Sequence, residues 1–213
     1  MASANWDTIH AERAALANDL AAISDEAWTT PSMCSSWDVQ QLLGHMTATA
    51  KMTPLTFVGR MAGAGFRFSV MAQRLVDKET VGTPQQTLAE FRAHADDSTA
   101  PPGPPDTWLG ETIVHGTDIR WPLGLERDFP IDALVRLADF YKNSNAIIGS
   151  KRRIEGVRMR ATDTDWSTGA GAEVSGPMLA LVMAMTGRRP ALLRLTGDGV
   201  ATLDSRLSAP AAG

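Results

Sequence analysis

The sequence predicts a mainly helical protein in which a helical bundle spans residues 1–149 and a small α+β domain spans residues 150–213. Most segments before residue 149 repeat apolar side chains with the helical period of about 3.6 residues. After that point the pattern changes, because VRMRATD alternates apolar and polar residues as a half-buried strand does. With 213 residues, of which 44% are hydrophobic, the chain is long enough to bury a substantial core.

The first half of the predicted bundle contains two amphipathic helices. Residues 5–23 form the first helix, and the turn-forming residues after it end the periodic pattern. In the SSWD segment, Ser35 and Asp38 resemble a capping box that starts the second helix. The apolar stripe of this helix consists of Val39, Leu42, Leu43, Met46 and Ala50. His45 lies on the flank of the stripe, a position suited to a side chain that faces a cleft.

Three further segments follow in the predicted bundle. Residues 55–77 are rich in apolar side chains, but three glycines interrupt them and weaken the helical signal. Thr83 and Pro84 are typical of the cap and the first turn of a helix. The proline-rich residues 98–106 are expected to be extended, and a helix is expected from about 107 to about 120.

The last helix of the predicted bundle follows Pro130 and stops near Gly149, where the C-terminal domain begins. Short strands and turns come next, then a compact apolar helix over residues 177–187. Residues 191–207 predict a strand, a Gly-Asp-Gly turn and a short final segment. The apolar helix is either plain core or the wall of a pocket for an apolar ligand, and plain core is the commoner origin of such a run.

The overall charge argues against nucleic acid and membrane partners, and the cysteine count indicates the redox compartment. A net charge of −4 and a pI near 5.5 give no reason to expect nucleic acid or an anionic membrane. Cys34 is the single cysteine, so it cannot form an internal disulfide, and a reducing compartment is expected. The N-terminus lacks a signal-peptide pattern, and no stretch reaches about 20 apolar residues, so we expect a soluble, cytoplasmic protein without a membrane partner.

The segment ETIVHGTDIRWPLG, residues 111–124, carries the candidate metal site. Glu111 and His115 are four residues apart, so on a helix their side chains lie on one face, one turn apart. His45 supplies a third donor from a different predicted helix. Three protein ligands leave a coordination position open for water or substrate, which is typical of catalytic metal centres. Asp118, on the same face, is a candidate acceptor for an imidazole N–H.

Simpler interpretations of these residues remain open. A Glu/His pair at this spacing also stabilises many exposed helices without binding anything. His45 taken alone fits an ordinary core or surface histidine. His10 and His94 fit amphipathic helices and are interpreted as structural, and Cys34 is interpreted as an unreactive thiol.

Three stretches of the chain resemble the mycothiol-dependent maleylpyruvate isomerase family, which is part of the DinB-like metal-binding helical bundles. SSWDVQQLLGHM resembles the family's W-x-V-x-x-L-x-x-H segment, and ETIVHGTDIRWPLG resembles its E-x-x-x-H-x-x-D-x-R-x-P-L-G segment. ATDTDWSTGAGAEVSGP, MTGRR and LTGDGVATL resemble its C-terminal region. The resemblance therefore spans most of the chain in the expected order.

This resemblance implies a DinB-like up-and-down four-helix bundle that holds a divalent metal ion through His45, Glu111 and His115. It also implies mycothiol as cosubstrate. A metal with an open position binds a thiol as its thiolate, well below the usual thiol pKa of about 8.5. Mixed nitrogen and oxygen ligands favour zinc, with nickel, iron and cobalt as alternatives.

The predicted function is metal activation of a low-molecular-weight thiol for attack on a small electrophilic substrate, in an S-transferase or a cis-trans isomerase. The sequence identifies no catalytic residue beyond the ligands. Arg120, Arg188 and Arg206 are candidates for binding a substrate carboxylate, but spacing supports none of them. A non-catalytic metal-binding or small-molecule-binding protein is the alternative, because a fold does not fix a function. A homodimer is compatible with the sequence, which does not determine the oligomeric state.

Overall fold

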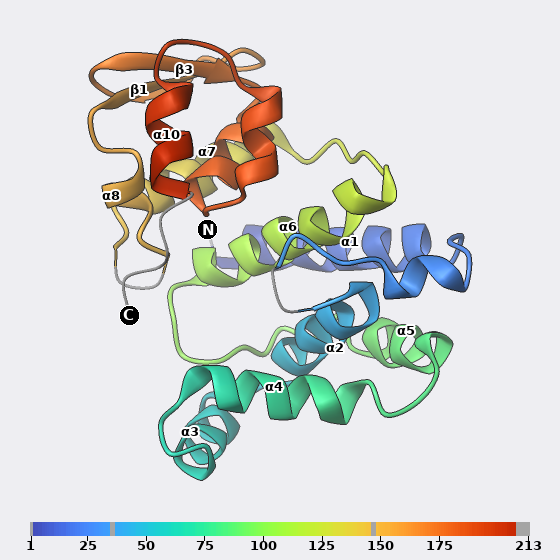
Figure 1. Ribbon diagram of the computed structural model, residues 1–213. Helices are drawn as coiled ribbons and strands as arrows, with labels where there is room; N and C mark the ends of the chain where they lie inside the picture. Colours follow the sequence, from blue (N-terminus) through green and yellow to red (C-terminus); the bar gives the residue numbers. More distant parts are fainter. Residues whose placement is uncertain (1, 35–36, 146–147, 208–213) are drawn as a thin grey trace. The chain divides into compact units, whose positions relative to one another are not determined.

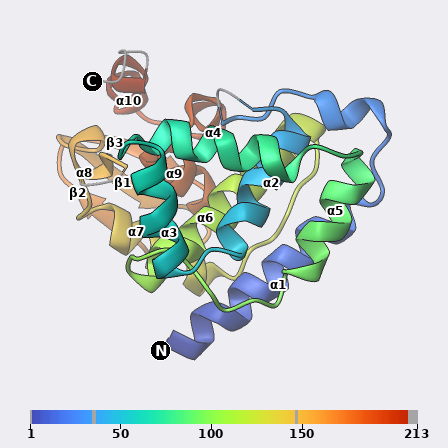
Figure 2. The same ribbon diagram turned by 90° about the horizontal axis from the view of Figure 1, so that it is seen from below.

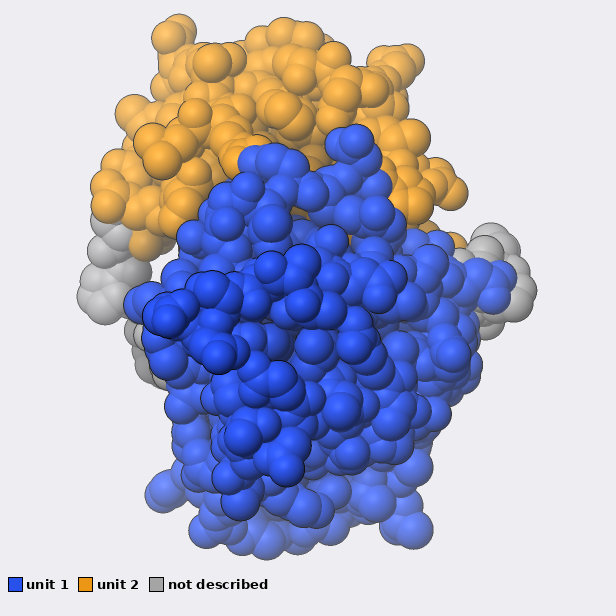
Figure 3. All heavy atoms as spheres, turned by 90° about the vertical axis from the view of Figure 1, so that its right-hand side faces the viewer, with its two compact units in different colours: residues 1–128 blue, residues 129–213 orange. Residues whose placement is uncertain are grey.

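A computed structural model describes residues 2–34, 37–145 and 148–207 of the chain. Two compact units are distinguished in it, residues 1–128 and residues 129–213 (Figure 3). Unit 1 is helical, and unit 2 combines helices with a three-stranded sheet. The predicted fold class, a mainly α bundle followed by a small α+β region, is confirmed.

Unit 1 contains six α-helices within the described residues (Figure 1). They are α1 (Ala2–Leu20), α2 (Val39–Ala50), α3 (Pro54–Gly63), α4 (Phe68–Glu79), α5 (Pro84–Ala93) and α6 (Pro105–Arg120). The 3-10 turns η1 (Glu26–Thr29) and η2 (Trp121–Leu123) follow α1 and α6. None of the helices in the described part of the chain is long and apolar enough to cross a membrane.

Four of these helices form the bundle. Helix α1 packs against α5 and α6, and α2 packs against the same two helices, while α4 covers a further side of α2 (Figures 1 and 2). The shared core draws Leu16 and Leu20 from α1, Leu42 from α2, Phe91 from α5 and Ile119 from α6. Burial of these large apolar side chains, each worth about 1.5–3 kcal/mol, fixes α2 against α6. These two helices carry the candidate site.

Helix starts follow from local capping. The Asp38 carboxylate accepts a hydrogen bond from the Gln41 backbone N–H at 2.8 Å, and the Gln41 side chain accepts one from the Asp38 N–H at 3.1 Å. Helix α2 therefore begins at Val39, and Ser35, the predicted cap, lies outside the described residues. Thr83 caps α5 as predicted.

The glycine-rich region 55–77 folds as two helices joined by a tight turn. Helix α3 ends at Gly63, and Gly65 and Phe66 then adopt left-handed conformations, with φ of 62° and 59°. The left-handed region cannot continue a right-handed helix, so α4 starts afresh at Phe68. The extended connection predicted over 98–106 is present, although α6 begins slightly earlier than expected.

Unit 2 combines helices with the sheet. Its elements are α7 (Ile131–Tyr141), α8 (Ser150–Arg153), β1 (Val157–Ala161), β2 (Ser167–Gly169), β3 (Ala172–Gly176), α9 (Met178–Met185), η3 (Arg189–Arg194) and α10 (Val200–Leu207). The strand order is β2-β1-β3, with β1 antiparallel to β2 and parallel to β3. Met159 pairs with Thr168 on one side and with Val174 on the other. The alternation of buried and exposed residues along β1 matches the pattern seen in the sequence.

The end of unit 2 differs from the prediction. A strand was expected from about residue 191, but the structure has the 3-10 helix η3 followed by α10. Leu193 is 91% exposed although its two predecessors are buried, so this run presents no strand-like apolar face. The segment contributes one isolated bridge to the sheet region, between Ser175 and Thr196.

Helix α9 explains where the two units divide. Seven of its eight residues are buried, as expected of a helix that is apolar on every side, so core burial accounts for the run. Helix α7 packs against α9 and ends at Tyr141 rather than near Gly149. The predicted helix after Pro130 therefore belongs to unit 2, which begins at Phe129, and the domain boundary at residue 149 stays a prediction.

Candidate metal centre

Two histidines from distant parts of the chain lie side by side in unit 1. His45 on α2 and His115 on α6 have ring centroids 5.3 Å apart, with their ring planes at 90°. Packing of α2 against α6 produces this approach. Two imidazoles at this separation can bind the same ion, and their role as ligands stays a prediction.

The imidazole of His45 lies against two aromatic rings, those of Trp37 and His115. The indole ring of Trp37 stacks on its imidazole, with ring centroids 4.8 Å apart and an angle of 29° between the planes. Burial, reinforced by the neighbouring His115, lowers the pKa of His45 to about 3. The imidazole is therefore neutral at physiological pH and has a lone pair available for a metal ion.

His115 is oriented by a buried carboxylate. Its Nδ1 atom lies 2.9 Å from Oδ2 of Asp118, whose side chain is fully buried. When Nδ1 carries the proton and donates to Asp118, Nε2 is left with the free lone pair. The contact predicted for Asp118 from its place on the helix face is thus present.

Glu111 lies one helical turn before His115, and its carboxyl group is buried. Its Oε1 atom has no hydrogen-bond partner within the part of the chain that the structure describes. Burial raises the pKa of Glu111, while electrostatic interactions with His115 and Arg13 and a hydrogen bond from Thr49 act in the opposite direction. An unpartnered, buried carboxylate oxygen is unfavourable unless a cation or a proton satisfies it.

Arg13 is a functional neighbour that the sequence did not single out. It lies on α1, is 2% exposed, and donates a hydrogen bond from its guanidinium to the backbone oxygen of Asp97 at 3.0 Å. Burial lowers the pKa of Arg13, and the charges of Glu111 and Asp97 counteract this. The only signal in the sequence is its place: Arg13 occupies a core position of the amphipathic pattern of α1.

The tightest group of potential ligands differs from the predicted set. Within the described residues, donor atoms of Cys34, His115 and Asp118 all lie within 4.8 Å of one another. This group shares only His115 with the predicted ligands. Cys34 reaches it because the Met33 N–H donates to the backbone oxygen of Asp118 at 3.0 Å, which ties the loop before α2 to α6. Sequence spacing could not reveal this loop-to-helix contact.

The three arginines considered for substrate binding have structural contacts. Arg120 is 1% exposed, and its Nε donates to Asp19 on α1 at 2.7 Å. In unit 2, the guanidinium of Arg188 donates to the backbone of Thr186, and that of Arg206 donates to the backbone of Arg153. The contact between Arg120 and Asp19 therefore links α6 to α1.

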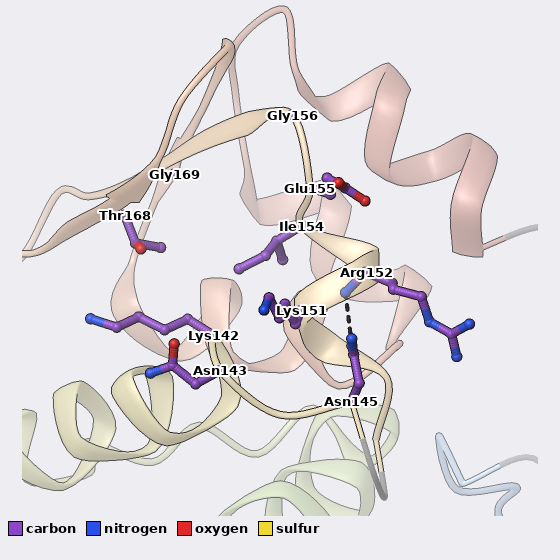
Figure 4. A pocket seen from close by; sticks show the side chains of 10 residues that line it. All are labelled: Lys142, Asn143, Asn145, Lys151, Arg152, Ile154, Glu155, Gly156, Thr168 and Gly169. Carbon is purple, nitrogen blue, oxygen red and sulfur yellow. Dashed lines mark hydrogen bonds between the residues drawn. The ribbon is translucent and has the colours of Figure 1, made fainter.

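Unit 2 has a polar pocket of its own, with a volume of about 450 Å³ (Figure 4). Lys142, Lys151 and Arg152 line it together with asparagines and Glu155. The backbone N–H of Arg152 donates to Oδ1 of Asn145 at 3.0 Å, the contact drawn in Figure 4. Most of these side chains are exposed, so the pocket is a shallow, solvated hollow.

Comparison with known families identifies the chain. A family model described as "Mycothiol maleylpyruvate isomerase N-terminal domain" matches residues 9–118, more than half of the chain. The chain belongs to this family. The matched region contains all three predicted metal ligands of this chain, and it ends at Asp118.

Solved structures extend the similarity to the whole fold. A crystal structure of the mycothiol-dependent maleylpyruvate isomerase superposes with a TM-score of 0.65 at 14% sequence identity, covering 93% of each chain. A histidine-to-alanine mutant of that isomerase gives a TM-score of 0.64 at the same identity and coverage. At this identity the likeness establishes a shared fold. No curated protein matches the sequence.

Proposed function

We propose that this protein is a divalent-metal-dependent enzyme that uses mycothiol in an isomerisation or S-transfer reaction. His45, Glu111 and His115 would hold the metal ion. One observation carries the proposal: among the described residues the buried Oε1 atom of Glu111 lacks a hydrogen-bond partner, one turn from an imidazole that contacts a second imidazole. The family supports mycothiol as the thiol, and the lone Cys34 is consistent with a reducing cytoplasm.

The residues present fit a divalent metal ion. Two imidazoles, one of them held neutral by burial, and one carboxylate form a nitrogen and oxygen donor set that suits zinc, with nickel, iron or cobalt as alternatives. When bound, the ion would act as a Lewis acid that favours the thiolate form of a thiol at neutral pH.

The chain's own residues prepare this site. Asp118 would accept a hydrogen bond from the Nδ1–H of His115 in the tautomer that leaves the lone pair of Nε2 free for the metal ion. Trp37 covers one face of His45 and limits both its rotation and its access to water. Arg13 partly offsets the charge of the Glu111 carboxylate, which would otherwise be unfavourable in a buried site. We assign no group to substrate binding.

Metal content and turnover of the same preparations test the proposal. Wild type is expected to retain about one equivalent of metal and to convert small electrophiles, such as activated double bonds and haloarenes, only with mycothiol. His115→Ala should lose both properties. His94→Ala, which removes the histidine that follows the last residue of α5 in the same unit, should keep both.

Equal metal content in wild type and His115→Ala would refute the coordination site. Metal lost in His115→Ala, without thiol-dependent turnover of any electrophile in wild type, would refute the catalytic role. That second result would leave a non-catalytic metal-binding protein.

A further inference from the structure

Some apolar side chains of helix α3 pack on unit 1, and others lie in solvent. Phe57 and Met61 pack against a buried cluster that includes Met71 of α4. The side chains of Leu55 and Val58 are 82% and 56% exposed. Large apolar side chains that lie together in solvent are typical of an interaction surface.

The turn after α3 extends this surface. Phe66 is 74% exposed and Phe68 is 58% exposed, so two aromatic rings lie in solvent where the chain leaves α3 and enters α4. Phe66 is the one non-glycine residue with positive φ in the described chain. A hydrogen bond from its backbone N–H to the Met61 oxygen at 2.8 Å holds this conformation. The backbone accepts an unfavourable conformation for a bulky side chain here, and the ring nevertheless faces solvent.

The charge of this region is opposite to that of the chain as a whole. Residues 51–76 contain one lysine and three arginines without a single Asp or Glu, whereas the whole chain has a net charge of −4. Lys51 is neutralised by ion pairs with Glu79 and Glu90. Arg60 and Arg67 have no acidic partner among the described residues, so two cationic groups flank the exposed apolar side chains.

We infer that one corner of unit 1 docks on an anionic lipid surface. This apolar–basic corner consists of Leu55, Val58, Arg60, Phe66, Arg67 and Phe68. Exposed apolar and aromatic side chains beside unpaired arginines match the acyl chains and the anionic headgroups of such a surface. Helix α3 lies at the outer edge of unit 1, where a flat surface can reach it (Figure 1).

Charge complementarity favours lipid over a second copy of the chain. A two-fold contact through this corner would bring the guanidinium groups of Arg60 and Arg67 toward their own copies, which is unfavourable. The expectation that the protein has no membrane partner used the net charge of the whole chain, which conceals a basic segment of 26 residues. Docking of this kind needs no membrane-spanning helix.

Co-sedimentation with vesicles tests the inference. Wild type should bind vesicles of equal parts phosphatidylglycerol and phosphatidylcholine, bind pure phosphatidylcholine vesicles at least about tenfold more weakly, and dissociate as salt is raised. The double variants Leu55→Ser/Phe66→Ser and Arg60→Gln/Arg67→Gln should each bind the anionic vesicles at least about tenfold more weakly. Val81→Ser is the matched control, because Val81 is 85% exposed in unit 1 but lies outside the corner.

Equal binding of wild type to both vesicle types, or no binding to either, would overturn the inference. So would a loss of binding in Val81→Ser as large as that in Leu55→Ser/Phe66→Ser. Light scattering on the same samples tests the competing occupant: a vesicle-free dimer of wild type that dissociates in Leu55→Ser/Phe66→Ser would assign the corner to self-association instead. Thermal melts of each variant show that the fold is kept.

Discussion

The chain contains the same acid–histidine–acid spacing twice, and the two copies have different environments. Glu90, His94 and Asp97 repeat the offsets of Glu111, His115 and Asp118. In both triplets the histidine Nδ1 contacts the following aspartate, at 2.6 Å in the first and 2.9 Å in the second. The spacing alone therefore does not define a metal site, and the surroundings must distinguish the triplets.

The first triplet is exposed and its charges are paired. Glu90 and Asp97 have side chains that are 46% and 42% exposed, and Lys51 contacts Glu90 at 2.8 Å. The hydrogen bond and the charge of Lys51 lower the pKa of Glu90. Such a surface network contributes at most about 1 kcal/mol per pair.

The second triplet is buried and incomplete. Burial raises the pKa of Glu111, one of its oxygens lacks a hydrogen bond among the described residues, and a second imidazole, that of His45, lies against His115. Functional sites are where such unfavourable arrangements are retained. Unsatisfied buried polarity and a third potential donor therefore distinguish the second triplet, which is the proposed metal site.

The largest difference in zinc affinity is expected between variants of the two glutamates. Glu111→Gln should weaken zinc binding by about 100-fold or more, because loss of a direct ligand exceeds the 10–100-fold typical of supporting residues. Glu90→Gln should leave the affinity unchanged within about twofold, since its partner is Lys51. Competition with a chromophoric chelator measures both. Similar losses in the two variants would erase the distinction between the triplets.

A smaller difference in zinc affinity is expected between variants of the two aspartates. Asp118→Asn should weaken zinc binding by about 10–100-fold, because the tautomer and orientation of His115 are no longer fixed. Asp97→Asn should have no effect on zinc affinity, although it makes the equivalent contact with His94. An Asp118→Asn loss as large as that of Glu111→Gln would instead indicate that Asp118 is itself a ligand.

Acidification should destabilise the metal-free protein through His45. Burial lowers the folded-state pKa of His45 to about 3, while the unfolded chain takes up this proton below about pH 6.5. The stabilisation is complete above pH 6.5 and is lost as the pH falls toward 3, by up to about 1.4 kcal/mol per pH unit. Urea unfolding in the presence of chelator should show this slope in wild type but a shallower one in His45→Gln. Identical slopes would contradict the burial of a neutral imidazole.

The smallest effect is expected at Cys34. If the predicted ligands bind the metal, Cys34→Ser should change zinc affinity by less than about threefold, even though its donor atom lies close to His115 and Asp118. Cobalt loading offers a second readout, since a thiolate ligand gives an intense charge-transfer band that Cys34→Ser would remove. The presence of that band in wild type would favour the Cys34, His115 and Asp118 set.

The sequence predicts those features of the fold that depend on local patterns. The cap at Thr83, the proline-rich connection before α6 and the alternation along β1 are all present in the structure. The strand expected near residue 191 is absent from the described residues, because the path of that segment depends on its packing beside β3 rather than on its own periodicity. The placement of α7 in unit 2 has a similar origin, because it depends on the packing of α7 against α9.

Prediction of the site reached its limit at tertiary contacts. Spacing placed Glu111, His115 and Asp118 on one helix face, and the His115–Asp118 contact follows from it. Spacing could not rank this triplet above Glu90, His94 and Asp97, because the burial of Glu111 and the placement of Arg13 depend on how α1, α2 and α6 pack. The approach of Cys34 to His115 likewise depends on a loop contact that no local pattern encodes.

Anomalous diffraction from crystals grown with zinc tests whether His45, Glu111 and His115 bind the metal ion. We expect one strong peak bonded to His45, Glu111 and His115, with metal–nitrogen distances of about 2.0–2.1 Å. A peak bonded to Cys34 and Asp118, a peak at Glu90 and His94, or no peak in unit 1 at saturating zinc would contradict the account.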